Sequence, residues 1–269
     1  MESATVSPTM SDTETTARTR FETLLAPHGE LLRGYLHRLV GHRADAEDLL
    51  QETTLKAFER LPALRDDGAF RSWIFRIATS TALDHLRKQT RWRPYSQSLY
   101  EAECAHDDAL RGEIVETTRD EEFAYDVREH IAFCFACVGR SLQPDVAAAL
   151  TLREVMGLSN REAADALEVS ESVLRHHLSA GRRNMEETFE GLCSLVNKQG
   201  ICRQCSSFRK VTAEPRRGPA LPVLQGRDDA WQARLAIVRQ RPFVDGVARS
   251  LHELMFARLA QLEAKPSTP

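Results

Sequence analysis

Cysteines spaced for thiol chemistry occur in two distant parts of the chain. Cys134 and Cys137 lie in IAFCFACV, and Cys202 and Cys205 lie in GICRQC. Four thiolates from two such C-x2-C pairs would hold Zn²⁺ tetrahedrally and tie the tail of the chain to an earlier helix. The first pair sits in an apolar run, where cysteines also act as small hydrophobic side chains. Zinc binding, a thiol redox switch and plain burial are therefore three open alternatives.

A second pattern could contact nucleic acid. In SNREAADALEVSESVLRHHLSAGRR (159–183), Ser159 can cap a first helix that carries Glu162 three residues later. A short connection through Val169 then leads to a second helix, which predicts a helix-turn-helix. An ordinary corner of a helical bundle is the alternative. The second helix would expose donors suited to base edges and phosphates in a major groove: Ser172, Arg175, His176, Ser179, Arg182 and Arg183.

A third pattern interleaves bases and aromatics in FRSWIFRIATSTALDHLRKQTRWR (70–93). The segment from Arg65 to Arg93 contains seven basic and three acidic residues, which gives it a net charge of +4. Such a helix is able to hold a phosphate backbone and to stack or bond unpaired bases. The alternative is a core helix, because Phe70, Trp73 and Ile77 also fit an apolar stripe.

The elements that must position these residues are all helical. Apolar residues recur at spacings of three and four, and strand-like alternation is not visible. We expect a disordered tail (1–18), a first helical domain (19–93), an acidic linker (94–125), a second helical domain (126–190) and a Cys-containing helical extension (191–269). Residues 101–129 hold eleven acidic residues against three arginines, a net charge of −8, which predicts an extended or partly disordered tether.

Composition excludes several classes of protein. The 269 residues carry a net charge of −3, so any nucleic-acid role rests on local charge. The longest apolar run, Ile131–Val138, is too short to span a membrane, and the first twenty residues lack a secretory signal, so we expect a cytoplasmic protein. There is no Gly-rich phosphate loop, no catalytic His and carboxylate set and no nucleophile motif, so we expect no enzyme.

Two of these segments carry a family resemblance. DAEDLLQETTLKAF (45–58) followed by FRSWIFRIATSTALDHLRK (70–88) closely resembles regions 2.1–2.4 of the extracytoplasmic-function (ECF) sigma factors of the sigma-70 family. Residues 126–189 resemble region 4 of the same group, in the same order along the chain. The resemblance implies a factor that binds core RNA polymerase, recognises minus-35 and minus-10 promoter DNA and promotes DNA melting, while the polymerase supplies catalysis.

The resemblance also implies roles for particular residues. The acidic helix that begins near Asp45 would dock on core polymerase through Asp45, Glu47, Asp48, Gln51 and Glu52. The basic-aromatic helix at 70–88 would melt and read the minus-10 element through Arg71, Arg76, Ser80, His85, Arg87 and Lys88. The helix-turn-helix would read the minus-35 element through Ser172, Arg175, His176, Arg182 and Arg183.

Other functions and partners stay open at this stage. A stand-alone helix-turn-helix regulator would bind duplex sites as a dimer and would not need the basic-aromatic helix. A metal- or redox-sensing interaction protein would make the cysteines central. No cofactor is required for a sigma factor, zinc through Cys134, Cys137, Cys202 and Cys205 is a tentative addition, and an anti-sigma factor is a further candidate partner. The extension is unexplained by the resemblance and is expected to be a built-in regulator or a docking hairpin.

Overall fold

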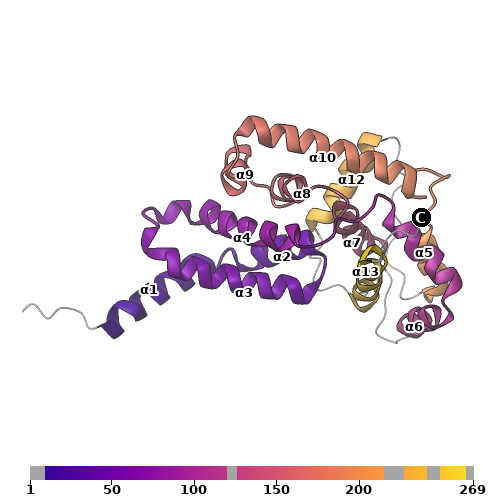
Figure 1. The fold of residues 1–269 in the computed structure, drawn as a ribbon, viewed down its shortest axis with the longest axis horizontal. Coiled ribbons are helices and arrows are strands. Elements are labelled where there is room, and N and C mark those ends of the chain that lie inside the picture. The colour runs from indigo at the N-terminus through magenta and orange to yellow at the C-terminus, as the bar shows by residue number, and fades with distance from the viewer. Residues whose placement is uncertain (1–9, 120–125, 215–226, 241–248, 265–269) are drawn as a thin grey trace, which may run out of the picture.

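The computed structural model describes residues 10–119, 126–214, 227–240 and 249–264, and within these ranges the chain is helical (Figure 1). One isolated parallel bridge, between Cys193 and Cys202, is the β-type pairing found in them. The elements are α1 (Met10–Leu25), α2 (Gly29–Val40), α3 (Arg43–Arg60), the short 3-10 turns η1 (Leu61–Ala63) and η2 (Asp67–Ala69), α4 (Phe70–Arg87), α5 (Ser96–His106), α6 (Asp108–Arg119), α7 (Val127–Gly139), α8 (Pro144–Leu150), the π-helical turn η3 (Thr151–Val155), α9 (Asn160–Leu167), α10 (Glu171–Leu192), α11 (Gln204–Val211), α12 (Arg227–Gln240) and α13 (Arg249–Ala264). The predicted all-α class is confirmed.

Helices α2, α3 and α4 pack together as an N-terminal domain. Leu36, Ile74 and Phe75 are fully buried in its core, and the Tyr35 hydroxyl shares a buried 2.9 Å hydrogen bond with Thr79. Gly41 ends α2 with a φ of 75°, a left-handed conformation that glycine adopts at little cost. This core positions α3 and α4, the two helices that carry the predicted polymerase and minus-10 residues.

Helices α8, α9 and α10 form a second domain directly above α4 (Figure 1). Gly181 of α10 lies so close to α8 that a Cβ there would meet Val146 and Leu150 at 2.7 Å. The buried cluster of the N-terminal domain continues into α8 and α9, since it includes Ala148 and Ala163. The two domains therefore share one apolar core across their junction.

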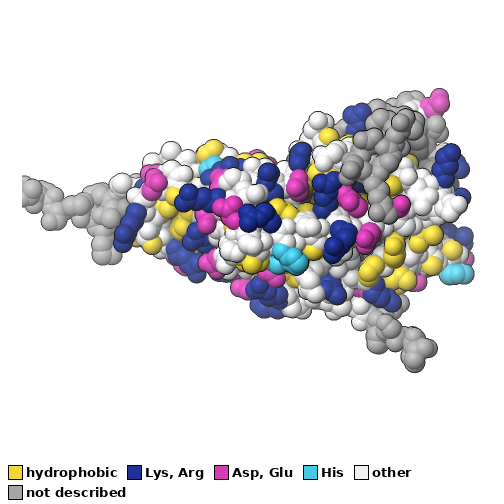
Figure 2. Space-filling view, turned by 90° about the horizontal axis from the view of Figure 1, so that it is seen from above, with side chains coloured by type: hydrophobic (Ala, Val, Ile, Leu, Met, Phe, Trp, Pro, Cys, Tyr) yellow, Lys and Arg dark blue, Asp and Glu magenta, His cyan; other side chains and the backbone are white. Residues whose placement is uncertain are grey.

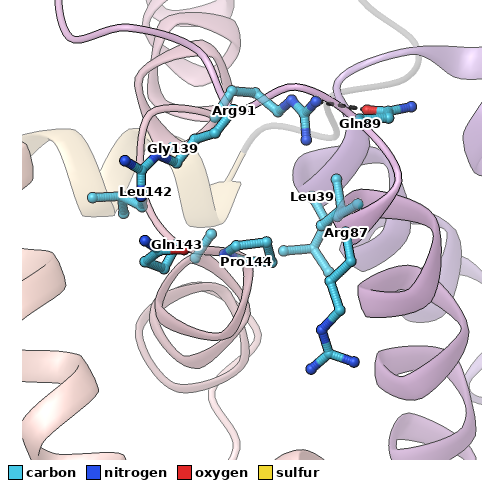
Figure 3. Close-up of a pocket in the computed structure, with 11 residues that line it drawn as sticks. Leu39, Arg87, Gln89, Arg91, Gly139, Leu142, Gln143 and Pro144 are labelled. Carbon is cyan, nitrogen blue, oxygen red and sulfur yellow. Dashed lines mark hydrogen bonds between the residues drawn. The ribbon is translucent and has the colours of Figure 1, made fainter.

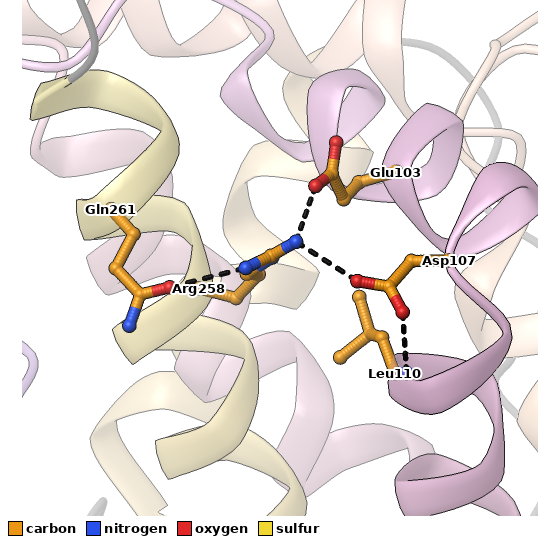
Figure 4. Close-up of polar contacts among 5 residues, drawn as sticks. All are labelled: Glu103, Asp107, Leu110, Arg258 and Gln261. Carbon is orange, nitrogen blue, oxygen red and sulfur yellow. Dashed lines mark hydrogen bonds and ion pairs between the residues drawn. The ribbon is translucent and has the colours of Figure 1, made fainter.

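The acidic segment is not an extended tether, because α5 and α6 occupy most of it. The prediction was wrong since it lacked the partner that these helices pack against, namely α13. Arg258 of α13 lies between Glu103 and Asp107 and pairs with both carboxylates (Figure 4). Apolar packing on α13, together with these two ion pairs, gives the acidic segment a partner that its own composition does not predict.

The N-terminal tail is also shorter than predicted. Helix α1 begins at Met10, inside the range 1–18 for which disorder was predicted, while residues 1–9 lie outside the described residues. Phe21 is buried against Phe58 and Phe70, and Arg20 pairs with Asp67. These contacts anchor the C-terminal half of α1, and the helix extends from that anchor toward the N-terminus.

The last two helices of the extension, α12 and α13, both contact α7, and each also packs on different neighbours. α12 packs on α7, α10 and η3, whereas α13 packs on α5, α6 and α7. The predicted helices are present, but they are not a simple hairpin, and their connection over 241–248 lies outside the described residues. None of the described helices has the length and apolar character needed to cross a membrane.

Candidate nucleic-acid interface

Local capping builds the α9–α10 pair. The Ser159 hydroxyl accepts a hydrogen bond from the Glu162 backbone N–H, and the Glu162 carboxylate accepts one from the Ser159 N–H at 2.8 Å, which completes a capping box. Glu168 turns the chain with a φ of 56°, and the Ser170 hydroxyl caps α10. The predicted helix-turn-helix is therefore encoded by residues within the motif itself.

The outer face of α10 is open to solvent. Leu174, Gly181 and Met185 are buried against the rest of the domain. Figure 2 looks onto the side of the molecule where α10 lies and shows basic side chains interspersed with acidic ones. The predicted minus-35 residues that this helix leaves exposed are Ser172, Arg175, His176 and Arg183.

Arg182 differs from the other predicted minus-35 residues. It is half-buried, its Nε donates a 2.8 Å hydrogen bond to Glu186, and its guanidinium lies 5.8 Å from the ring centre of Trp231 in α12. A guanidinium over an indole face is a favourable cation–π arrangement. The extension thus covers one residue of the predicted DNA-reading set.

Helix α4 has one face in the core and one face at the surface. Phe70, Ile74 and Ile77 are buried, and Trp73 packs on the same cluster, so the apolar stripe is structural. The opposite face carries residues of the predicted minus-10 set, of which Arg76, Ser80, Arg87 and Lys88 are exposed and Arg71 and His85 are half-buried. The core-helix alternative therefore holds for one face of α4, and the nucleic-acid role of the opposite face stays a prediction.

Three arginines of α4 contact the second domain. Arg71 pairs with Glu162 of α9 at 3.3 Å, and Arg76 Nε donates to the Asp165 carbonyl at 3.1 Å. Arg87 reaches Asp145 of α8 at 3.1 Å. An acidic residue or a carbonyl of the second domain therefore occupies each of these donors, as a phosphate oxygen would.

A cleft of about 220 Å³ separates the two domains near the end of α4 (Figure 3). Leu39 and Arg87 line it from the N-terminal domain, and Leu142 and Pro144 line it from the other side. The Arg140 guanidinium donates to Gln89 at 2.6 Å beside it, which holds the chain after α4 against the end of α7.

Helix α3 carries the predicted polymerase-binding residues. Asp48, Gln51 and Glu52 are exposed, and Glu52 pairs with Lys56 at 2.6 Å. The other two are half-buried, since Asp45 lies 3.7 Å from His85 and Glu47 lies 3.6 Å from Arg33. The acidic face is therefore open toward its middle and partly paired near its N-terminus.

Comparison with known proteins gives the same division of the chain. A family model for sigma-70 region 2 matches residues 24–92, and one for sigma-70 region 4 matches residues 134–185. The chain is 29% identical over 172 residues to an ECF RNA polymerase sigma-E factor of Haemophilus influenzae, covering 64% of this chain and 88% of that protein. It is 30% identical over 148 residues to the ECF RNA polymerase sigma-E factor of Escherichia coli, covering 55% of this chain and 75% of that protein.

The chain belongs to the ECF sigma factors of the sigma-70 family. It is also 29% identical over 173 residues to the RNA polymerase sigma-H factor of Pseudomonas aeruginosa, covering 64% of this chain and 87% of that protein. The predictions of family, all-helical fold and sigma-factor function are confirmed, and the stand-alone regulator is not favoured. The roles of individual residues at polymerase and promoter stay predictions.

The cysteines of this sigma factor divide in a way that their spacing did not suggest. Cys134 and Cys202 pack on a cluster with α10 and α12, whereas Cys137 is buried in a second cluster with α13. Cys193, which was outside the proposed zinc set, pairs its backbone with Cys202. Across the described part of the chain, which contains all six cysteines, no three or more His, Cys, Asp and Glu side chains gather in an arrangement able to hold a metal ion.

Sequence reasoning missed the contacts between α4 and the second domain. Glu162 was identified only as a capping residue, yet its carboxylate also pairs with Arg71, which is 91 residues away. It also missed Arg234, whose Nη2 donates to the Cys193 sulfur at 3.0 Å. No local pattern signals either contact, because both depend on how separate helices pack.

Proposed function

We propose that this sigma factor binds core RNA polymerase through the acidic face of α3 and reads the minus-35 element with α10. The single observation that carries this proposal is the order of its parts. A region 2 match and a region 4 match follow one another along the chain, and the region 4 match contains a capped helix-turn-helix with exposed donors. Side chains on the first half of such a helix suit the base edges of a major groove.

The minus-10 role belongs to α4 and the turn before it. Arg71, Arg76 and Arg87 are the donors that a displaced strand would need, and the turn at η2 would help to hold an unstacked base. In the described arrangement these donors contact the second domain. We propose that polymerase and promoter binding replace these contacts, so that α4 separates from α9 before the strand is bound.

Partners beyond polymerase and promoter DNA are a finer part of the proposal. An anti-sigma factor would have to cover α3 or the α4 face, and the acidic residues of α8 and α9 already occupy part of the latter. Zinc at the cysteines is a separate proposal, and it requires a different ligand set from the two C-x2-C pairs because Cys137 faces another cluster. Metal analysis of the purified chain tests it directly.

A run-off transcription assay tests the proposal. The full chain and core bacterial RNA polymerase are incubated with upstream DNA fragments from the host, and transcripts that require the chain support a sigma factor. Loss of one good base contact costs about 1–3 kcal/mol, so Arg175→Ala should lower transcription by about tenfold or more at a fixed promoter. Glu187→Ala, exposed on the same helix, is the matched control.

Polymerase binding is read separately by co-elution with the core enzyme. Asp48→Lys reverses an exposed charge on α3 and should weaken co-elution, whereas Glu59→Lys near the end of the same helix should weaken it less. If the wild-type chain yields no transcript and does not co-elute, the proposal is wrong. If it co-elutes but Arg175→Ala transcribes normally, the assignment of α10 is wrong while the polymerase surface stands.

A further inference from the structure

Two cysteines meet where α10 ends. Cys193 follows Leu192, the last residue of α10, and the chain returns after a short loop so that Cys202 lies beside it. The Cys202 N–H donates to the Leu192 carbonyl at 2.7 Å, and the Ser194 N–H donates to the Cys202 carbonyl at 3.2 Å. Backbones paired in this way lie about 5 Å apart, which is inside the Cα separation that a disulfide accepts.

The loop between Cys193 and Cys202 packs closely against the Cys193 backbone at Gly200. A Cβ on Gly200 would lie 2.5 Å from the backbone carbon of Cys193, so the loop passes directly against the cysteine it must reach. All six cysteines are free thiols in this structure. The pairing of residues 193 and 202 is therefore a property of the backbone and does not depend on a covalent link.

An arginine is buried beside this pair. Arg234 of α12 is only 2% exposed, and its Nη2 donates to the Cys193 sulfur at 3.0 Å while the guanidinium lies 4.0 Å from the ring centre of Phe189. Its Nε and Nη1 are buried without a hydrogen-bond partner. A buried cation is costly unless an anion accompanies it, and in the described part of the chain the sulfur of Cys193 is its one hydrogen-bond acceptor.

Among the cysteines, Cys193 is the one to which Arg234 donates a hydrogen bond in the described part of the chain. Burial raises the pKa values of Cys134, Cys137 and Cys202, and Arg234 opposes the effect for Cys134 alone. Cys137 lies in the cluster on the α13 side of α7. Cys193 is thus the sulfur that contacts the buried guanidinium, and Cys202 is the thiol whose backbone is paired beside it.

We propose that Cys193 and Cys202 form a redox site that hydrogen peroxide converts to a disulfide. The Cys193 thiolate attacks the peroxide, an S–O bond forms as the O–O bond breaks, and the leaving hydroxide takes up a proton to give water. The Cys202 sulfur then attacks the sulfenic sulfur, an S–S bond forms as the S–O bond breaks, and the Cys202 proton leaves with the hydroxide as a second water. The two sulfurs lose two electrons, and the peroxide gains them.

Oxidation changes the charge balance around α12. A disulfide carries no charge, so Arg234 would remain buried without an anion, and the contact that ties α12 to the end of α10 would weaken. α12 also supplies Trp231 to Arg182 and the Val238 carbonyl to Arg38. Release of α12 would uncover Arg182 for DNA, a consequence that rests on the proposed function of α10.

The test treats the full reduced chain with hydrogen peroxide and maps its cysteines by alkylation and peptide mass spectrometry. We expect one disulfide joining Cys193 to Cys202, with the other four thiols still alkylated. Cys202→Ser should stop at a sulfenic acid that dimedone traps at Cys193, and Cys137→Ser should behave as the wild type. A disulfide between another pair, dimedone trapped at another cysteine, or co-purified zinc that depends on Cys193, would overturn the proposal.

The role of Arg234 has its own test. Arg234→Met should slow disulfide formation by about tenfold or more, and Arg234→Lys should preserve the rate within about threefold, because it keeps the charge. An unchanged rate in Arg234→Met would contradict the role of the cation. If Arg234→Met does not fold, hydrogen–deuterium exchange in the wild type decides instead: we expect oxidation to raise exchange over 227–240, and equal exchange in the two forms contradicts the release of α12. These readouts do not involve polymerase, so they are independent of the transcription assay.

Discussion

Two interfaces between helices hold the molecule together, and they differ in the kinds of side chain that form them. Between α4 and α9, alanines such as Ala163 and Ala164 pack on the N-terminal core, and half-exposed arginines form the polar contacts. Between α13 and its neighbours, Phe256 lies 4.8 Å from Trp92 by ring centres, and His252 stacks on Phe133 at 4.5 Å. Aromatic burial contributes more per residue than alanine burial, and exposed ion pairs contribute little.

The contrast teaches where the molecule should open. The α4 surface proposed to meet promoter DNA is held against the second domain by the weaker α4–α9 interface. The stronger α13 interface joins the extension to α5, α6 and α7 and leaves α4 and α10 outside it. We therefore expect α4 to part from α9 while α13 stays bound.

Phe256→Ala should have the largest effect on stability. The ring is buried against Trp92 and sits over Gly41, and replacing such a ring costs about 3–5 kcal/mol. Chemical denaturation of the full chain measures the loss of unfolding free energy. Phe256→Leu keeps most of the volume and should lose much less. A loss below about 1 kcal/mol in Phe256→Ala would remove the proposed difference between the interfaces.

Acidification should weaken the α13 interface next. Burial lowers the pKa of His130 to about 4, and its Nδ1 lies 3.3 Å from His252 Nε2. The unfolded chain binds a proton at this residue below about pH 6.5 while the folded chain stays neutral, so stability is intact at pH 7 and falls as the pH drops toward 4. The difference in protonation of His130 between the folded and unfolded chain should lower the free energy of unfolding by about 2 kcal/mol between pH 7 and pH 5.

Denaturation curves at the two pH values measure this change. His130→Gln removes the titrating group and should show a shallower loss of stability on acidification than the wild type does. Parallel losses in the two proteins would assign the pH dependence to other groups, such as His37, whose pKa burial also lowers, to about 3.

Arg258→Met should have a moderate effect. Its guanidinium pairs with Glu103 and, at 3.0 Å, with Asp107, and all three side chains are about a quarter to a third exposed (Figure 4). Two carboxylates would lose their shared cation, at a cost of about 1 kcal/mol that decreases with added salt. Arg111→Met, which breaks an exposed pair with Asp108, is the control and should change the unfolding free energy by less than about 0.5 kcal/mol. Equal losses would contradict the role given to Arg258.

Glu162→Gln should have the smallest effect on stability and the most direct effect on the separation of α4 from α9. Glutamine still completes the capping box, so the change removes only the pair with Arg71, worth at most about 0.5 kcal/mol. Because that contact holds α4 to α9, binding of single-stranded promoter DNA should tighten by up to about twofold. Fluorescence anisotropy with a labelled oligonucleotide measures it, and Glu187→Gln on α10 serves as control. Weaker binding than in the control would contradict the opening at α9.

Local signals explain what the sequence could predict. The capping box of Ser159, the cap at Ser170 and the proline that begins α8 set the boundaries of the second domain from within a few residues. The same holds for the apolar stripe of α4. These elements depend on nearby side chains and not on distant partners.

Long-range packing explains what could not be predicted. The acidic linker packs on α13, which lies about 150 residues further along the chain, and composition alone carries no sign of this partner. The C-x2-C spacing suggested one site for Cys134 and Cys137, but different helices cover the two sides of α7 and separate these thiols into different clusters. The position of Arg234 beside Cys193 likewise follows from where α12 docks.

The anchoring of α10 bears on how such a factor acquires new promoters. Leu174, Gly181 and Met185 hold the helix from one side, and Gly181 leaves no room for any larger residue against α8. The solvent-facing positions carry almost none of the folding free energy, so substitutions there are close to neutral for stability. A library of substitutions restricted to 172, 175, 176 and 179 would therefore sample new target sequences on an unchanged scaffold. Variants with new promoter specificities could then be selected from it without compensating mutations in the core.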